Sequence, residues 1–279
     1  MNDFLEDDPL EKHQTAALNA GVGGLTKDGY RHKVFSMMPR GHNIGGKVFL
    51  IVVGLILFVP SYKAFSCTLF GAIGDRVEGG GVLIGKTRDR PKGLEQAFIE
   101  VLPKSGYGYR GISLKGVRNV TSGMNERGLV VVSAAASNVE KEDKVTTVGK
   151  ILSKAASVDE VIVLAQKGEI QGPIHYLVGD IHKMALLEMI DDRRHEVLVK
   201  ENGVLCHTNH FILKEMRKFN PKIGVSSEAR LNRIENLLSE GSFTKDKFIG
   251  YTQDHFNGPG NNSICRHFKV GVQSGERTV

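Results

Sequence analysis

The sequence predicts an α+β fold in which antiparallel strands form sheets and the helices are segregated from them. Three observations support this prediction. Short runs of strand-forming residues separated by turn signals fill residues 67–134, two helical patterns follow within 146–168, and further strands and a helix come later. Runs of strands followed by runs of helices are typical of this class. The 279 residues, of which 41% are hydrophobic, suffice for one sizeable domain.

The first strands form a predicted hairpin. Residues 67–74 and 82–87 each have the composition of a strand, and Gly79-Gly80-Gly81 lies between them. Glycine accepts a positive φ at no steric cost, so these three residues are suited to a turn. Six more strands are predicted at 96–102, 117–121, 128–134, 175–180, 184–190 and 196–200.

The helices are predicted from end signals and apolar spacing. Two helices occupy 146–168, and the second begins at Ser157, because Ser157 and Glu160 match the capping box in which each side chain binds an N–H group at the helix start. Another helix is predicted from 226 or 227 to 239. Its apolar residues recur at helical spacing and include Ile234, Leu237 and Leu238.

A leader precedes the first strand. Residues 29–74 contain no Asp or Glu, and within them a basic stretch leads into an apolar run of 12 residues, Val48–Val59. A membrane-spanning helix needs roughly 20 such residues, whereas a secretory signal needs fewer. Ala64 and Ser66 stand three and one residues before Cys67, as signal peptidase requires. We therefore predict cleavage after Ser66, with Cys67 as the first residue of the mature chain.

These signals divide the chain into three parts. Residues 1–36 are expected to be a disordered extension or to precede the true start at Met37 or Met38. Residues 37–66 are the predicted signal peptide, and 67–279 are the folded domain. The expected location is outside the cytoplasm, periplasmic or extracellular, and the membrane is contacted only through the leader. An uncleaved signal anchor is the alternative, in which case the protein stays associated with the membrane.

Composition and motifs exclude several classes of function. The net charge is +6, but much of the excess lies near the N-terminus, and no stripe of Lys and Arg with interleaved aromatics occurs, so no nucleic-acid partner is predicted. The three cysteines do not suggest a disulfide framework. H-E-x-x-H, C-x-x-C, P-loop and dinucleotide motifs are absent, and neither a metal nor another cofactor is predicted. The oligomeric state is left open.

An N-terminal cysteine carries two reactive groups in one residue. Its thiolate is a strong nucleophile, and its α-amino group, with a pKa of about 7.7–8.0, can act as a base near neutral pH. Such a residue could cleave an amide without a separate histidine. The alternative for Cys67 is an inert buried thiol at the start of a strand.

Four stretches, in this order, carry a resemblance to a known family. They are Cys67-Thr68 with residues 85–89 (GKTRD), residues 123–129 (GMNERGL), residues 207–211 (HTNHF) and residues 262–267 (NSICRH). The mature region resembles the cysteine-dependent N-terminal-nucleophile (Ntn) hydrolases that act on linear amides. It is most similar to the acyl-coenzyme A:aminopenicillanate acyltransferase-like branch and more distantly similar to the choloylglycine hydrolases.

The resemblance implies a fold, an activity and site residues. The fold is a four-layer αββα sandwich of two antiparallel sheets. The activity is cleavage of a small N-acyl amide, or acyl transfer from it, through a thioester on Cys67. Asp89 would orient the α-amino group, Asn125 and Asn209 would donate to the oxyanion, and Arg266 would favour the thiolate. From the residues alone, Asp89 could be a strand-end carboxylate, Asn125 or Asn209 a turn residue, and Arg266 part of a surface ion pair.

The same stretches suggest substrate contacts. Choloylglycine hydrolases carry Arg where this chain has Lys86, which keeps the charge but lacks the planar fork. Arg88 lies two residues on and could replace that Arg only through a shift of register. His210 and Ser263 complete the predicted substrate-binding set, although His210 could also be an ordinary strand-end histidine.

Two other functions are compatible with the sequence. A cysteine directly after an apolar signal can be a lipoprotein acceptor, which would make the protein a lipid-anchored binding module; the usual lipobox, however, has Leu where Ala64 stands. The chain also ends at Val279, earlier than the resemblance implies. An inactive, truncated family member is therefore the remaining expectation.

Overall fold

The structure is a computed structural model that describes residues 66–91, 93–137, 139, 147–267 and 276–278. All of them lie in one structural unit, residues 59–279. The predicted extension 1–36 and nearly all of the predicted leader 37–66 fall outside the described residues. Among the helices that are described, none has the length and apolar character needed to cross a membrane.

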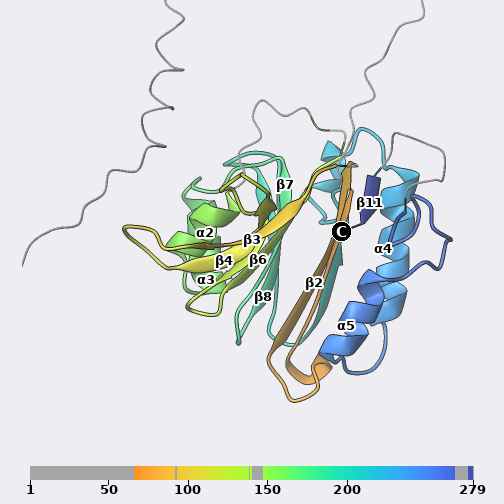
Figure 1. The fold of residues 1–279 in the computed structure, drawn as a ribbon, viewed down its shortest axis with the longest axis horizontal. Coiled ribbons are helices and arrows are strands. Elements are labelled where there is room, and N and C mark those ends of the chain that lie inside the picture. Colours follow the sequence, from red (N-terminus) through yellow and green to blue (C-terminus); the bar gives the residue numbers. More distant parts are fainter. Residues whose placement is uncertain (1–65, 92, 138, 140–146, 268–275, 279) are drawn as a thin grey trace, which may run out of the picture. The chain divides into compact units, whose positions relative to one another are not determined.

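Two antiparallel sheets form the centre of this unit (Figure 1). The smaller sheet has the strand order β10-β1-β2-β11, and the larger has the order β3-β4-β5-β6-β7-β8-β9. The strands are β1 Cys67–Ile73, β2 Val82–Pro91, β3 Gln96–Val101, β4 Tyr109–Leu114, β5 Ser122–Asn125, β6 Val130–Ala135, β7 Ile174–Gly179, β8 Met184–Met189, β9 His195–Lys200, β10 Gly203–His207 and β11 Glu276–Thr278. The helices are α2 Val148–Lys154, α3 Val158–Gln166, α4 Val225–Leu238 and α5 Lys245–Thr252, with short 3-10 turns at Gly74–Arg76 and Arg217–Phe219.

The helices cover the two outer faces of the sheet pair. In Figure 1, α2 and α3 lie beside the larger sheet, and α4 and α5 lie beside the smaller one. Three apolar clusters match these layers, since one joins α2 and α3 to the larger sheet, one joins α4 and α5 to the smaller sheet, and the third lies between the sheets. The predicted four-layer αββα sandwich is confirmed.

The register of the central hairpin decides which side chains meet. Cys67 pairs with Arg88, and Leu69 pairs with Lys86. Successive residues of a strand point to opposite faces. Cys67 belongs to the cluster between the sheets, so Lys86 and Arg88 face the same interior. Asp89, the residue after Arg88, points to the opposite face of the sheet, toward the layer of α4 and α5.

One predicted strand is wrong, and several elements were missed. Residues 117–121 form no strand; Gly116 has a φ of 79° in a tight turn there, and the strands lie on either side as β4 and β5. Val120 is buried in the outer core without being part of a strand, which explains the apolar pattern. The unpredicted elements are β4, β5, β10, β11 and α5. Their sequences lack strong alternation or helical periodicity.

The capping box at Ser157 is confirmed, with a change of partner. Ser157 Oγ accepts from Glu160 N at 3.3 Å, as predicted. The Glu160 carboxylate accepts from Ala156 N at 2.8 Å, one residue before the expected N–H group. Both bonds satisfy donors at the start of α3.

Candidate active site

Cys67 is the first residue of β1, which lies between β10 and β2 in the smaller sheet. Only 5% of its surface is exposed. Its main-chain nitrogen donates to Asn209 Oδ1 at 3.1 Å, a contact between residues 142 positions apart. The fold thus brings the predicted nucleophile and Asn209 together, but it presents the accepting oxygen of Asn209 to Cys67 rather than the N–H group that the predicted oxyanion role requires.

Asn209 is held from several sides. Its main-chain N–H donates to Ser227 Oγ of α4 at 3.0 Å, and its Nδ2 donates to the carbonyl of Ala135 at the end of β6 at 2.9 Å. His175 Nε2 lies 3.2 Å from the carbonyl oxygen of Asn209. These contacts fix the amide group with Oδ1 directed toward Cys67.

Arg230 is a site residue that the sequence did not reveal. This side chain is 1% exposed. Its Nη2 donates to Asn209 Oδ1 at 2.8 Å, and its Nη1 donates to Thr68 Oγ1 at 3.0 Å and to the carbonyl oxygen of Cys67. A signal was present in the sequence, because Arg230 lies four residues before Ile234 and therefore on the apolar face of the predicted helix.

Asp89 and Arg266 form an ion pair whose side chains are 0% and 4% exposed. Asp89 Oδ2 lies 3.1 Å from Arg266 Nε, and Asp89 Oδ1 accepts from Thr278 Oγ1 at 2.7 Å. The pair is therefore buried, which excludes the surface ion pair considered for Arg266. Burial raises the pKa of Asp89, and the charge of Arg266 opposes this change. Asp89 N also donates to the carbonyl of Ser66, the last residue before the predicted cleavage site, at 3.0 Å.

Lys86 and Arg88 share the inner face with Cys67, so no shift of register is needed for both to contribute. Lys86 Nζ donates to the carbonyl of Thr121 at 3.3 Å, and Arg88 Nη1 donates to Gln96 Oε1 at 2.7 Å. Burial lowers the pKa of Lys86 to about 8, while Cys67 acts in the opposite direction. Burial and the neighbouring Arg90 also lower the pKa of Arg88 to about 10. Two cations that are expensive to bury therefore lie beside the thiol.

The structure places Asn125 away from this site, and its predicted oxyanion role requires correction. Its Nδ2 donates to the carbonyls of Leu152 and Ala155 at 2.8 and 2.7 Å. These carbonyls belong to the end of α2, which lies on the outer face of the larger sheet. Its Oδ1 accepts from Arg127 N and Leu129 N, each at 3.1 Å. Asn125 is the turn residue that the sequence alone allowed.

The other two predicted substrate contacts have partners within the protein. His210 Nδ1 lies 2.8 Å from Ser227 Oγ, and burial lowers the pKa of His210. Ser263 is 0% exposed and donates to the carbonyl of Gly258 at 2.6 Å. Because Ser263 also accepts from Asn257 N at 3.1 Å, it closes a loop rather than facing a substrate.

A buried polar network lies next to Asn209. His207 Nε2 lies 2.6 Å from Glu188 Oε1, and both side chains are fully buried. Glu188 also accepts from Ile212 N at 2.6 Å and from Leu213 N at 3.2 Å. The rings of His175 and His207 are 4.2 Å apart. His207 Nδ1 also lies 2.9 Å from the carbonyl oxygen of Thr208, so both ring nitrogens of His207 have partners within the protein.

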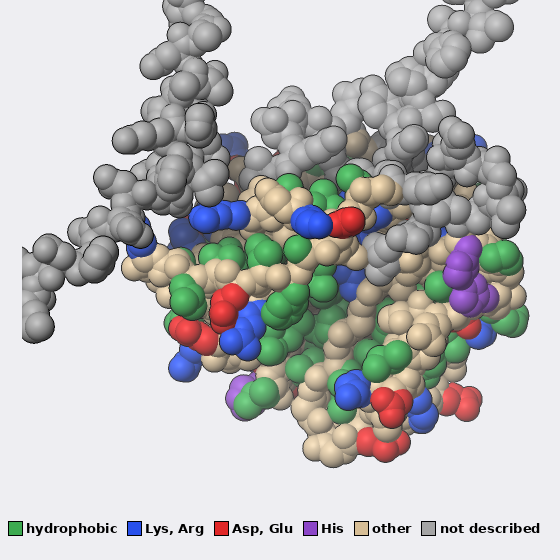
Figure 2. Space-filling model, viewed as in Figure 1, with side chains coloured by type: hydrophobic (Ala, Val, Ile, Leu, Met, Phe, Trp, Pro, Cys, Tyr) green, Lys and Arg blue, Asp and Glu red, His purple; other side chains and the backbone are tan. Residues whose placement is uncertain are grey.

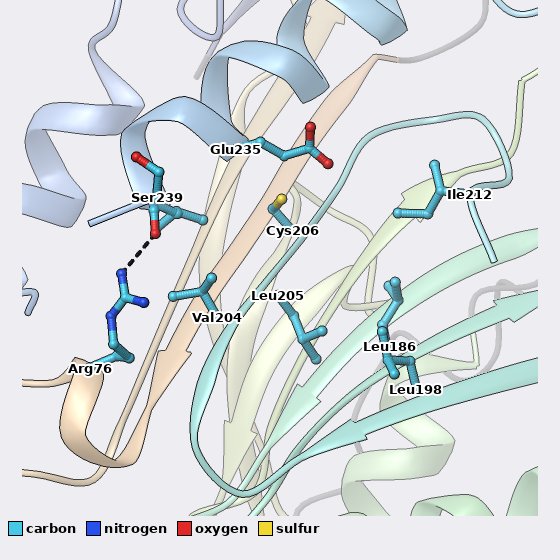
Figure 3. Close-up of a pocket in the computed structure, with 10 residues that line it drawn as sticks. Arg76, Leu186, Leu198, Val204, Leu205, Cys206, Ile212, Glu235 and Ser239 are labelled. Carbon is cyan, nitrogen blue, oxygen red and sulfur yellow. Dashed lines mark hydrogen bonds between the residues drawn. The ribbon is translucent and has the colours of Figure 1, made fainter. Parts of the chain in front are cut away.

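A separate pocket of about 300 Å³ lies beside β10 and does not include Cys67 (Figure 3). Its lining is mostly apolar, and Cys206 and Glu235 face one another across it. Burial and the charge of Glu235 raise the pKa of Cys206 to about 12. Cys206 is therefore a poor nucleophile at neutral pH.

Comparison with known proteins agrees with the motifs described above. Residues 76–272 match the family model of acyl-coenzyme A:6-aminopenicillanic acid acyl-transferase. The 40 kDa form of acyl-coenzyme A:6-aminopenicillanic-acid-acyltransferase from Emericella nidulans is 30% identical over 115 residues, which are 40% of this chain. The chain spans only 31% of that relative's length.

Three solved structures are also similar. An N-acylethanolamine-hydrolyzing acid amidase ortholog from Caenorhabditis elegans is 13% identical, with a TM-score of 0.46 over 67% of this chain and 86% of its own. Penicillin V acylase from Agrobacterium tumefaciens is 20% identical, with a TM-score of 0.30 over 49% and 50%. A mutant conjugated bile acid hydrolase from Clostridium perfringens is 18% identical, with a TM-score of 0.38 over 75% and 62%. The family model matches residues 76–272, well over half of the present chain, and the chain therefore belongs to the acyl-coenzyme A:6-aminopenicillanic acid acyl-transferase family.

Proposed function

We propose that the chain is the precursor of an exported enzyme that cleaves a linear amide, or transfers its acyl group, through a thioester on Cys67. One observation carries the proposal: the main-chain nitrogen of buried Cys67 donates to Asn209 Oδ1. Cleavage after Ser66 would convert this peptide nitrogen into an α-amino group that already has its partner. The matching family model and the acyltransferase relative support this class of reaction.

The surroundings of Cys67 suit the amine to act as a base. A neutral amine can keep its N–H bond to Asn209 and direct its lone pair at the thiol proton. The guanidinium of Arg230, which contacts the Cys67 carbonyl, is a like charge to the protonated amine. A nearby like charge disfavours the protonated form, which increases the fraction of free base near neutral pH.

The reaction proceeds in two stages. The thiol sulfur attacks the amide carbonyl as the α-amine takes its proton, and the resulting oxyanion is stabilised by hydrogen-bond donors beside the thiol. The C–N bond breaks, the leaving nitrogen takes the proton, and a thioester remains. Water then releases the acid and restores the thiol, whereas an amine acceptor would instead carry the acyl group away.

The inner face beside the nucleophile suggests which substrates fit. Lys86 and Arg88 place two cations on the face of the sheet that carries Cys67. We infer a small N-acyl compound that bears a carboxylate, such as an N-acyl amino acid or a penicillin. The carboxylate would offset the cost of burying these cations.

The geometry disfavours the lipoprotein alternative. A lipidated cysteine must be reachable from the membrane and ends a tether, whereas Cys67 is 5% exposed and begins a strand between two others.

The test is the mass and N-terminal sequence of the full chain expressed with export, before and after iodoacetamide. We expect a chain that begins at Cys67 and is alkylated there first, because burial raises the pKa values of Cys206 and Cys265. A Cys67→Ser variant should be processed at the same bond but lose the rapid alkylation and all turnover of N-acyl substrates. A lipid on Cys67, or a chain that retains residues 48–59, would overturn the proposal.

A further inference from the structure

Three potential metal ligands converge beyond the end of α5. They are His255, Cys265 and His267, and their Nε2, Sγ and Nε2 atoms all lie within 4.8 Å of one another. The two Nε2 atoms are 2.6 Å apart, and Cys265 Sγ lies 3.8 Å from His267 Nε2. Figure 2 shows histidine side chains gathered on this face of the molecule. Two ring nitrogens that point at each other either share an N–H···N hydrogen bond or can hold a metal ion between them.

The backbone around this cluster is fastened on both sides. Cys265 N donates to the carbonyl of Asp254 at 2.9 Å, which holds the two ends of the loop together. Asp254 is paired with Arg233 of α4 at 2.7 Å, and the Arg233 guanidinium lies 4.2 Å from the Phe256 ring. The neighbours of His255 on both sides are thus anchored to one helix. Such support positions the ligands before an ion binds.

The donor set identifies the ion. Two imidazoles and a thiolate are the ligands that Zn²⁺ takes in tetrahedral sites, at about 2.0–2.1 Å for nitrogen and about 2.3 Å for sulfur. Those lengths place ligand atoms about 3.3–3.6 Å apart. The observed 2.6 and 3.8 Å bracket this range, so small side-chain rotations suffice. Exposure of both histidines leaves an entry path and room for water as the fourth ligand.

We propose that His255, Cys265 and His267 form a Zn²⁺ site that fastens the segment carrying Arg266. Cys265 and His267 flank Arg266, whose side chain points the other way to Asp89 at 3.1 Å and to Ser226 Oγ at 2.5 Å. A Zn²⁺ ion bound at the surface would therefore also hold the buried side chain of Arg266 in place. Asp89 and Asp254 help burial to raise the pKa of Cys265, and the ion would displace the thiol proton.

The experiment titrates the purified full chain with Co²⁺, a spectroscopic substitute for Zn²⁺. We expect a sulfur-to-cobalt charge-transfer band that saturates at one ion per chain and is abolished by added Zn²⁺. Cys265→Ser should remove the band, and His255→Ala and His267→Ala should each weaken Zn²⁺ binding by about a hundredfold. His182→Ala, which removes an exposed histidine that does not belong to the cluster, should change nothing.

Two further results separate this site from the other thiols. The band should persist in Cys67→Ala, and Zn²⁺ should protect Cys265 from alkylation while Cys206 is unaffected. A band that survives in Cys265→Ser, or none at one equivalent, would overturn the proposal. Neither result depends on turnover, so the fate of this site and that of the proposed enzyme activity can be told apart.

Discussion

At the residue scale, the main chain of Cys67 is held by two side chains from distant parts of the sequence. Asn209 Oδ1 accepts from the Cys67 nitrogen, and Arg230 donates both to Asn209 Oδ1 and to the Cys67 carbonyl. The planar guanidinium serves three acceptors at once, which an ammonium group cannot match in geometry. Arg230 therefore acts as a positioning residue for Asn209.

Replacement of Arg230 tests this arrangement. We expect Arg230→Lys to lower kcat for an N-acyl substrate by about ten- to a hundredfold, because the Asn209 amide and the Cys67 main chain lose their orientation. Loss of the Arg230 guanidinium should also lower the unfolding free energy, measured in urea, by about 1–3 kcal/mol, since buried acceptors lose their donors. Exposed Arg193→Lys is the matched control and should change neither quantity. Normal kcat in Arg230→Lys would remove the positioning role.

The lowered pKa of Lys86 gives a prediction about stability and pH. Burial lowers this pKa from 10.5 to about 8, so the folded protein holds the proton less tightly than the unfolded chain. The resulting penalty is complete below about pH 8 and disappears as the pH rises to about 10.5. Lys86→Met should therefore be more stable than the parent by about 1–2 kcal/mol at pH 7, after allowance for the remaining solvent contact.

Urea unfolding at several pH values measures this difference. The advantage of Lys86→Met should shrink between about pH 8 and pH 10.5. Lys115→Met provides the control, because Lys115 forms an exposed ion pair with Glu95 and should show no such trend. A constant difference across this range would contradict the predicted linkage.

At the element scale, the turn between β5 and β6 is tied to the end of α2. Asn125 donates to two carbonyls near the helix C-terminus and accepts two N–H groups of its own turn. The last carbonyls of a helix have no partners within it, so this side chain satisfies groups that would otherwise be buried without bonds. The contact joins the outer helix layer to the larger sheet.

Asn125→Ala and Asn209→Ala should separate stability from catalysis. We expect Asn125→Ala to lower the unfolding free energy by about 2–4 kcal/mol, because three buried backbone groups and one part-buried group lose their partner. Its kcat for an N-acyl substrate should stay near the parent value at a temperature where it is folded. Asn209→Ala should instead lower kcat by about a hundredfold, because the Cys67 nitrogen loses the acceptor that orients it. A comparable loss of kcat in Asn125→Ala would restore the oxyanion role that the structure disfavours.

At the scale of the whole molecule, a buried pair of Glu188 and His207 bridges the two sheets. Glu188 lies on β8 of the larger sheet and His207 on β10 of the smaller one, 2.6 Å apart. Glu188 also accepts two backbone N–H groups just after the Asn209 turn. The relative position of the sheets and the conformation of that turn therefore depend on one carboxylate.

Glu188→Gln should weaken the connection between the layers. The glutamine amide cannot accept from all three donors that Glu188 serves, which are His207 Nε2, Ile212 N and Leu213 N. Breaking a buried pair typically costs about 3–5 kcal/mol. Urea unfolding measures the loss, and Glu196→Gln is the control, because Glu196 is the cross-strand neighbour that accepts only from Glu215 N. A loss in Glu188→Gln no greater than in the control would show that the pair does not hold the sheets together.

Local patterns in the sequence were sufficient for many elements. Alternation and turn signals predicted β1, β2, β3 and the strands β6 to β9, and the capping box placed the start of α3. They failed at 117–121, where an apolar pattern comes from a buried loop next to a strand. Strands β10 and β11 and helix α5 carry weak local signals, so they could not be identified from sequence.

Local sequence patterns were enough to predict most of the strands and helices, the candidate cleavage site before Cys67 and the motifs that identify the family. Spacing and periodicity can report these properties because they act between neighbours along the chain. Only the tertiary structure decided that Asn209 and Arg230 contact Cys67, that Arg266 pairs with Asp89, and that Asn125 supports a helix instead. Those contacts join residues that are far apart in sequence, and they follow from the way both sheets and their helices pack.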